Sequence, residues 1–263
     1  MPMHLAAWQQ SIDEAGAFTP VTAVPDPVLT VLGTTIQVPT LSRVVALAAG
    51  VETTVAQQAR LTAPSRRILA QQRIAPTQGN AAAASLPSDP HHLLDLADTP
   101  LVMVVGEQAA IELLANPAAA QIQWGLVWFA DGPLVPAVGN FFTIRADAAQ
   151  LLVANQWTNS AIVFAENLPR GRYRVVGMRA QSAGLVAARL VFVGTGSQGP
   201  WRPGVMGTNN DRHLEYPGFR YGLWGPFGEF EDTDTPTVDF LSTAADAAEV
   251  LYFDLEQVRA GPA

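Results

Sequence analysis

The chain of 263 residues contains no cysteine and no lysine, and only 14% of its residues are charged. Without cysteine, disulfides and thiolate metal sites are excluded, while the redox compartment stays undetermined. Without lysine, Schiff-base catalysis and phosphate binding by a loop lysine are excluded as well. The net charge of −8 argues against nucleic-acid binding through a basic surface, because such a surface needs clustered positive charge to displace counterions.

Long apolar runs are also missing. The longest ones, 101–105 and 122–130, fall far short of the roughly 20 residues that span a bilayer, and residues 1–16 lack the features of a signal peptide. Yet 49% of the residues are hydrophobic, and the charged fraction lies below the roughly 25% of ordinary soluble domains. We expect a soluble chain, or one incorporated in an assembly, with much surface buried against partners.

Short β-rich runs separated by glycine, proline and asparagine predict an all-β fold. The clearest is 170–193, which predicts a hairpin of two long strands around a turn at 181–184. In its first strand, Tyr173, Val175, Gly177 and Arg179 would share one face. Further strands are expected at 28–38, 43–49, 53–61, 68–74, 101–105, 122–130, 141–146, 160–164, 237–241 and 249–258. For 53–61 and 68–74, helix is the alternative, because both are rich in glutamine and arginine.

Two segments favour short helices instead. Leu5, Trp8 and Ile12 lie at helical spacing before Gly16, so residues 1–27 are expected to form a helix and an extended arm. That helix would pack on its own domain or dock on a neighbouring subunit. Residues 107–115 predict a second helix, ended by Asn116 and Pro117.

The number of expected strands exceeds one eight-stranded barrel and suits two. We therefore predict jelly-roll β-sandwiches or barrels, two compact ones, over residues 28–135 and 136–263.

No motif indicates catalysis, so we expect a protein that is not an enzyme and holds no metal or cofactor. The glycine-rich segment 194–199 lacks the residues of a phosphate loop. His91 and His92 are adjacent in a proline-flanked loop, an arrangement atypical of metal ligands. An acidic cluster is interpreted as a solvated sheet edge rather than a calcium loop or a glycosidase pair. Its members are Glu229, Glu231, Asp232, Asp234 and Asp239.

The segment 216–230 is the best candidate for recognition, because it combines shaped glycine turns with many aromatic side chains. These are Tyr216, Phe219, Tyr221, Trp224, Phe227 and Phe230. They would either fill a subunit interface, where large aromatics concentrate, or stack on sugars. We favour the interface.

The succession of short strands, the 170–193 hairpin and the closing segment 225–241 resemble the jelly-roll coat proteins of tailless icosahedral viruses. In that family two four-stranded sheets stack with Greek-key connections. Some members carry two barrels side by side and trimerise into pseudo-hexagonal capsomers.

The resemblance implies a major capsid protein in the virion, which self-assembles as a homo-oligomer, expected to be a trimer, beside other capsid proteins. It also implies possible proximity to an internal membrane, and no sequence-specific contact with nucleic acid. A carbohydrate-binding β-sandwich or virion spike domain is the alternative, followed by a hydrolase that uses the acidic residues.

Arginines are expected to contact the acidic 229–234 edge of a neighbour, and aromatic residues to anchor the interface. The arginines are Arg170, Arg172, Arg202, Arg212 and Arg220. The expected anchors are Trp8, Trp201, Tyr221, Trp224 and Phe227.

Overall fold

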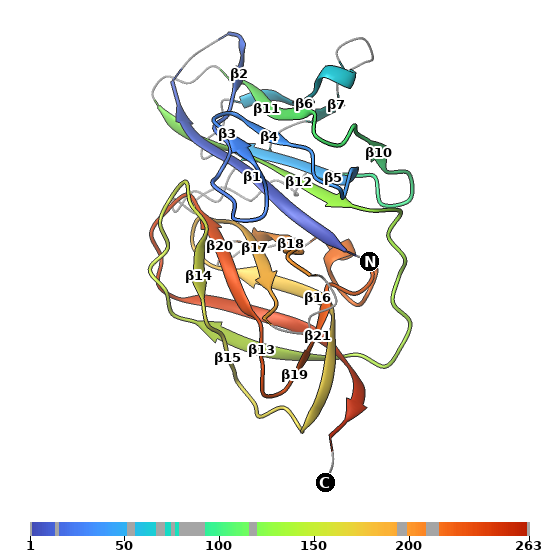
Figure 1. Ribbon diagram of the computed structural model, residues 1–263. Coiled ribbons are helices and arrows are strands. Elements are labelled where there is room, and N and C mark those ends of the chain that lie inside the picture. Colours follow the sequence, from blue (N-terminus) through green and yellow to red (C-terminus); the bar gives the residue numbers. More distant parts are fainter. Residues whose placement is uncertain are drawn as a thin grey trace.

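The computed structural model of the protein consists almost entirely of β-strands, which confirms the predicted all-β class (Figure 1). It describes residues 2–13, 16–51, 56–66, 72–74, 77–78, 93–115, 120–193, 199–208 and 216–261. Within these ranges the helices are two 3₁₀ turns, η1 (Pro64–Arg66) and η2 (Pro217–Phe219). In the same ranges, no helix has the length and apolar character needed to cross a membrane.

The first half of the chain forms a jelly roll of two facing sheets. One sheet has the order β1-β12-β5, followed by β9 and β10, which both pair with β5. Its strands are β1 (Met3–Ile12), β12 (Gln121–Ala130), β5 (Arg43–Val51), β9 (Leu93–Asp95) and β10 (Leu101–Val102). The other sheet has the order β2-β11-β6-β7. Its strands are β2 (Phe18–Pro20), β11 (Gln108–Ala115), β6 (Ala56–Thr62) and β7 (Gln72–Ile74).

Three short strands are additions to this barrel. The hairpin of β3 (Val31–Leu32) and β4 (Thr35–Gln37) pairs with β11, and β8 (Thr77–Gln78) pairs in parallel with β5. Gly33 turns that hairpin with a φ of 67°, a conformation that glycine adopts without steric cost.

The second half repeats the same strand order. One layer runs β13-β21-β16-β19 and the other runs β14-β20-β17-β18, and a short parallel pairing of β16 with β18 joins both layers, with β15, into a single nine-stranded sheet. The first contains β13 (Phe142–Ala148), β21 (Glu249–Ala260), β16 (Gly171–Gln181) and β19 (Gly228–Glu231). The second contains β14 (Thr158–Ser160), β20 (Thr237–Ser242), β17 (Leu185–Val191) and β18 (Gly204–Thr208), while β15 (Val163–Phe164) extends the edge of β13.

Lettered B to I in chain order, the strands of each half form sheets B-I-D-G and C-H-E-F, the Greek-key order of a jelly roll. In the first barrel, β9 and β10 share position G. The predicted all-β jelly-roll fold is therefore confirmed, and β1, placed in an N-terminal arm by the sequence interpretation, is the first strand of barrel one.

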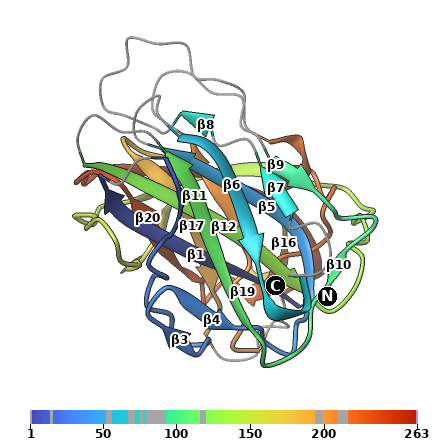
Figure 2. The ribbon, with the colours of Figure 1, turned by 90° about the horizontal axis from the view of Figure 1, so that it is seen from above.

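The layers of the two barrels stack in one pile, with the β1-β12-β5 sheet of barrel one lying on the β17-β18-β20 side of barrel two (Figure 1). Seen from above, β11 and β6 lie over β12 and β5 (Figure 2). The β1-β12-β5 sheet thus has apolar neighbours on both faces: Trp8 and Phe129 face the core of barrel one, whereas Leu5 and Trp128 face barrel two.

Both predicted helices are wrong. Residues 3–12 form β1 and residues 108–115 form β11. In β1, Ala6, Trp8 and Ile12 enter one core while Leu5 and Ala7 enter the other. A strand that is buried on both faces shows no polar alternation, so its apolar spacing does not distinguish it from a helix.

The predicted 170–193 hairpin has the right strands and the wrong pairing, because β18 lies between β16 and β17. Of the four residues expected on one face of β16, only the first two, Tyr173 and Val175, point into the core. A bulge between Val175 and Gly177 shifts the register against β21, so that Tyr173 and Val175 are followed in the core by Met178 and Ala180.

A substitution at Gly204 tests how closely β18 packs against β17 of its own barrel and β1 of barrel one. A Cβ there would lie 2.5 Å from the carbonyl oxygen of Ala188 and 2.8 Å from Cδ2 of Leu5. We expect Gly204→Ala to lower the free energy of unfolding by about 1–3 kcal/mol through overpacking, measured by denaturant titration. Gly139→Ala is the control, since its Cβ meets the movable carboxylate of Glu256. Equal losses in both variants would contradict the close packing of Gly204 against β17 and β1.

Candidate functional site

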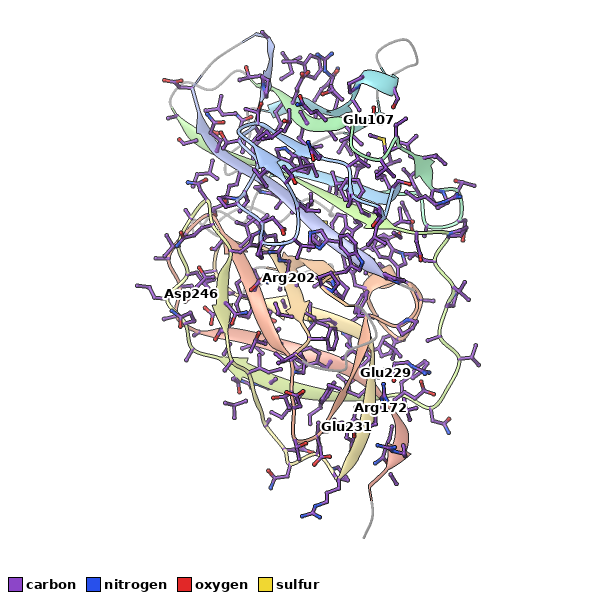
Figure 3. All side chains as sticks on the ribbon, in the orientation of Figure 1. Glu107, Arg172, Arg202, Glu229, Glu231 and Asp246 are labelled. Atoms are coloured by element: carbon purple, nitrogen blue, oxygen red, sulfur yellow. The ribbon has the colours of Figure 1, made fainter. Side chains whose placement is uncertain are left out.

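Five ionisable side chains from distant parts of the sequence meet between the two barrels. We call them the junction network: His4, Asp26, Arg189, Arg202 and Asp239. His4 comes from β1, Arg189 from β17 and Asp239 from β20, while Asp26 and Arg202 lie in connecting segments. Four are buried and Arg202 is partly exposed. Figure 3 places Arg202 at the junction of the barrels.

Arg189 is the centre of this network. Its Nε donates to Asp239 Oδ2 at 2.9 Å, and its Nη1 donates to the carbonyl oxygen of Leu5 at 3.1 Å and to Asp26 Oδ2. The guanidinium also lies 4.0 Å from the ring centroid of Trp157. A strand of barrel two is thereby joined to β1 and to the loop after β2, both in barrel one.

The two carboxylates are held by further donors. Asp239 accepts from Nη1 of Arg202 at 2.5 Å and from Nδ2 of Asn159 at 2.8 Å. Asp26 accepts from the backbone N–H of Val28 at 2.7 Å. Burial alone would raise the pKa of Asp26, but its contacts with His4 and Arg189 hold that pKa well below the usual range. Asp26 is therefore ionised at neutral pH.

His4 contacts the same network through both ring nitrogens. Its Nε2 lies 3.1 Å from Asp26 Oδ2, and its Nδ1 accepts from the backbone N–H of Arg202 at 3.2 Å. Burial lowers the pKa of His4, and the hydrogen bond to Asp26 opposes this only in part. The ring is therefore neutral, with its proton on Nε2.

Hydrogen bonds between uncharged groups also join the two barrels, next to the junction network. Gln9 Nε2 donates to the carbonyl oxygen of Ser242 at 2.9 Å, and Trp128 Nε1 donates to that of Gly204 at 2.7 Å. Leu5 N–H donates to the carbonyl oxygen of Arg202 at 3.0 Å. Since buried polar groups are stable only when they are paired, these contacts fix one relative position of the barrels.

A second buried ion pair shapes the loop 220–225. Arg220 donates to both carboxylate oxygens of Asp254, at 2.7 and 2.9 Å, and Tyr221 N–H donates to Oδ2 at 2.9 Å. Burial raises the pKa of Asp254, but these bonds lower it more. A Cβ at Gly177 would lie 2.3 Å from Asp254 Oδ2, so glycine makes room for the pair.

This ion pair holds Tyr221 with a φ of 51° and its side chain 58% exposed. Next to it, Ala137 N–H donates to the carbonyl oxygen of Gly222 at 2.8 Å, which brings residues 135–138 against the loop. These two adjoining segments carry four exposed apolar residues, which we call the apolar patch: Val135, Val138, Tyr221 and Leu223. The sequence interpretation found only Tyr221 among these.

Most of the predicted interface residues lie inside the chain. Trp8, Arg220, Trp224 and Phe227 are buried, Trp201 and Arg202 are partly buried, and only Tyr221 is exposed. Trp224 packs against Trp128 and Phe219 with ring centroids 6.1 and 4.8 Å apart. The four buried side chains therefore stabilise the protomer, and assignment of them as surface anchors is corrected.

The acidic edge also has arginine partners within the same chain. Arg172 pairs with Glu229, and Figure 3 shows these two residues close to Glu231. Arg174 also pairs with Glu229, and Arg259 pairs with Glu231 at 3.2 Å. Asp239, expected on this edge, is buried in the junction network. Arg212, His91, His92 and residues 194–198 lie outside the described residues. In the described ranges, no group of three metal-ligating side chains is found.

Glu249 is a buried carboxyl with an incomplete set of partners. Its Oε2 accepts from the backbone N–H of Gln150 at 3.3 Å, while within the described residues its Oε1 has no hydrogen-bond partner. Burial, with a contribution from nearby Asp246, raises its pKa to about 7. Asp246 itself accepts from Ser182 Oγ at 2.6 Å and Ala183 N–H at 2.8 Å.

Comparisons with known proteins add little. No family model matches the chain, and no curated protein matches it. Among solved structures, the crystal structure of the major capsid protein P2 from Bacteriophage PM2 is found at 13% identity over 97% of both chains, with a TM-score of 0.23. Chains that share a fold superpose at higher TM-scores, so the fold assignment above depends on the strand pairing alone.

Asp239→Asn tests the junction network. The variant leaves two arginines facing a neutral amide in a buried site, and breaking such a pair typically costs about 3–5 kcal/mol. We expect a loss of that order in the free energy of unfolding. Glu231→Gln is the control, because its partner Arg259 is largely exposed and surface pairs contribute about 0–1 kcal/mol. A loss no larger than the control's would contradict the structural importance of the network.

Glu249→Gln tests the buried carboxyl. An acid whose pKa is raised from 4.5 to about 7 contributes stability below pH 4.5 and loses it as the pH rises through 7. The amide does not titrate, so the stability of the variant relative to wild type should rise by roughly 1–3 kcal/mol between pH 4.5 and 8. Denaturant titrations at both pH values measure this, and a difference independent of pH would show that Glu249 has an ordinary pKa.

Proposed function

We propose that this chain is a non-enzymatic structural protein, the major capsid protein of a virion, which assembles with copies of itself. The observation that carries the proposal is the pair of jelly rolls with identical strand order, joined by a buried junction into one body. Repeated barrels in one chain provide a broad, rigid block, as in the coat-protein family that the sequence resembles.

Jelly rolls also occur in lectins and cupins, so the fold alone does not select a function. Here the barrel interiors are packed with apolar side chains, such as Phe129 in barrel one and Phe240 in barrel two. The aromatic residues that would stack on sugars are mostly buried in the 216–230 segment. The capsid hypothesis is thus favoured over the carbohydrate-binding alternative.

A second copy of this chain is the partner that we propose for the apolar patch. The patch carries no charge, so it has no electrostatic means of selecting an acidic or basic partner. Its Val138 is 92% exposed, and a hydrogen bond and a buried ion pair fix its two segments. A rigid apolar surface buries area at little cost in conformational entropy.

We infer that this contact is heterologous and closes a ring, a trimer in the resembled family. Contacts with other capsid proteins and an internal membrane remain predictions from the resemblance.

Val138→Arg tests the patch. A charge placed in the proposed contact should reduce self-association at least tenfold, corresponding to about 1.4 kcal/mol, while the melting temperature of the protomer stays unchanged. Val163→Arg is the matched control, since Val163 is 70% exposed on β15, away from the patch. Light scattering and electron microscopy measure the assemblies. A wild-type monomer at high concentration would contradict the capsid proposal, whereas equal assembly by both variants would contradict only the assignment of the patch.

A further inference from the structure

The junction network is electrically balanced as long as His4 is neutral. Two arginines, Arg189 and Arg202, face two aspartates, Asp26 and Asp239, through direct ion pairs. These four are the charged groups from barrel two, from the loop after β2 and from the segment before β18 that surround His4. Protonation of His4 would therefore add an uncompensated positive charge to a buried site, which is unfavourable.

The hydrogen bonds around His4 also select its neutral form. Nδ1 accepts from the backbone N–H of Arg202, and Leu5 N–H donates to the carbonyl oxygen of the same residue. A proton on Nδ1 would point at the Arg202 N–H, so that two donors would face each other. The ring could relieve this only by moving away from Arg202 and disturbing the contact of β1 with barrel two. The ring of Trp201 lies edge-on to the imidazole of His4, with the two ring centroids 5.8 Å apart, and limits movement of His4 on that side.

We propose that His4 is an acid-sensitive lock on the docking of the two barrels: neutral His4 holds them together, and proton uptake by His4 accompanies their separation. This inference goes beyond the proposed function and does not depend on it. No chemical step other than proton binding is involved.

The direction of the effect follows from linkage. In the separated state His4 is solvated and regains its ordinary pKa of 6.5, whereas burial lowers that pKa in the docked state. The docked state is therefore stable above pH 6.5 and loses stability as the pH falls below it. One proton taken up on opening makes the opening constant rise about tenfold per pH unit. Asp26 responds only at more acidic pH, because its ordinary pKa is 3.8.

Hydrogen exchange of the Leu5 amide on the full chain tests the proposal, because this N–H donates across the junction to Arg202. Its protection factor, corrected for the intrinsic pH dependence of exchange, should fall about tenfold per pH unit from pH 6.5 to about 5. The backbone amide of Leu61, in the β6–β11 pairing, reports the stability of barrel one alone and should keep its protection over this pH range.

His4→Gln is the matched variant. Glutamine can donate to Asp26 and accept from Arg202 but does not titrate, so the fall in Leu5 protection should be absent. Comparing this variant with wild type also cancels the contribution of Glu249, which titrates in the same pH range with the opposite sign. An equal fall in both proteins, or no fall in wild type, would overturn the proposal.

If the His4→Gln variant does not fold, NMR of the wild-type chain tests the proposal instead. Imidazole ¹⁵N shifts should show one of the four histidines as the neutral Nε2–H tautomer below pH 6, until junction protection is lost. A chain in which all four histidines titrate at pH 6.5 or above, with Leu5 still protected, would contradict the lock.

Discussion

The structure depends on the contact between the β1-β12-β5 sheet and barrel two. In a single jelly roll each sheet has one apolar face and one solvated face. Here the stacking covers the second face of this sheet with β17, β18 and β20, so that nearly every residue of β1 and β5 is buried. Such double burial strengthens the core, but it requires each polar group in the contact to find a partner within the protein. The junction network and Gln9 supply most of these partners, while Nη2 of the buried Arg189 has no hydrogen-bond partner within the described residues.

The same strand position therefore has different surroundings in the two barrels. Strand β12, at position I of barrel one, is buried along a continuous apolar run. Strand β21, at position I of barrel two, lies in the outermost sheet and ends in four exposed residues. The topology is repeated while the sequence pattern is not, which explains why the chain shows no obvious internal repeat despite its two equivalent barrels.

The strands and the class of fold could be predicted because turn residues separate the β-rich runs. The predictions failed where local pattern and tertiary context conflict. β1 lacks the polar alternation of a half-exposed strand, and the bulge in β16 moves Gly177 and Arg179 out of the face expected for them. Pairing of β16 with β17 was expected from their proximity in sequence, yet the next strand, β18, lies between them and pairs with both.

The junction network could not be assembled from the sequence, because its members are separated by up to most of the chain. A local signal did exist: Arg189 interrupts an apolar strand, and His4 and Gln9 interrupt another. A charged residue within a buried run is rarely tolerated without a partner. The aromatic residues of 216–230 were placed on the surface, since the loop-like composition concealed how closely that loop packs over β16.

The stacking of the sheets also has a consequence for synthesis on the ribosome. Strand β12 completes barrel one by pairing with β1, but the face that carries Leu5 and Trp128 gains its cover only when β17, β18 and β20 have emerged. During that interval the nascent chain presents an apolar sheet to the cytosol or to a chaperone. Domains usually fold as units in the order of their synthesis, and exposed apolar surface promotes aggregation. The N-terminal barrel alone would therefore be a poor fragment to express, whereas in the full chain barrel two buries this apolar face.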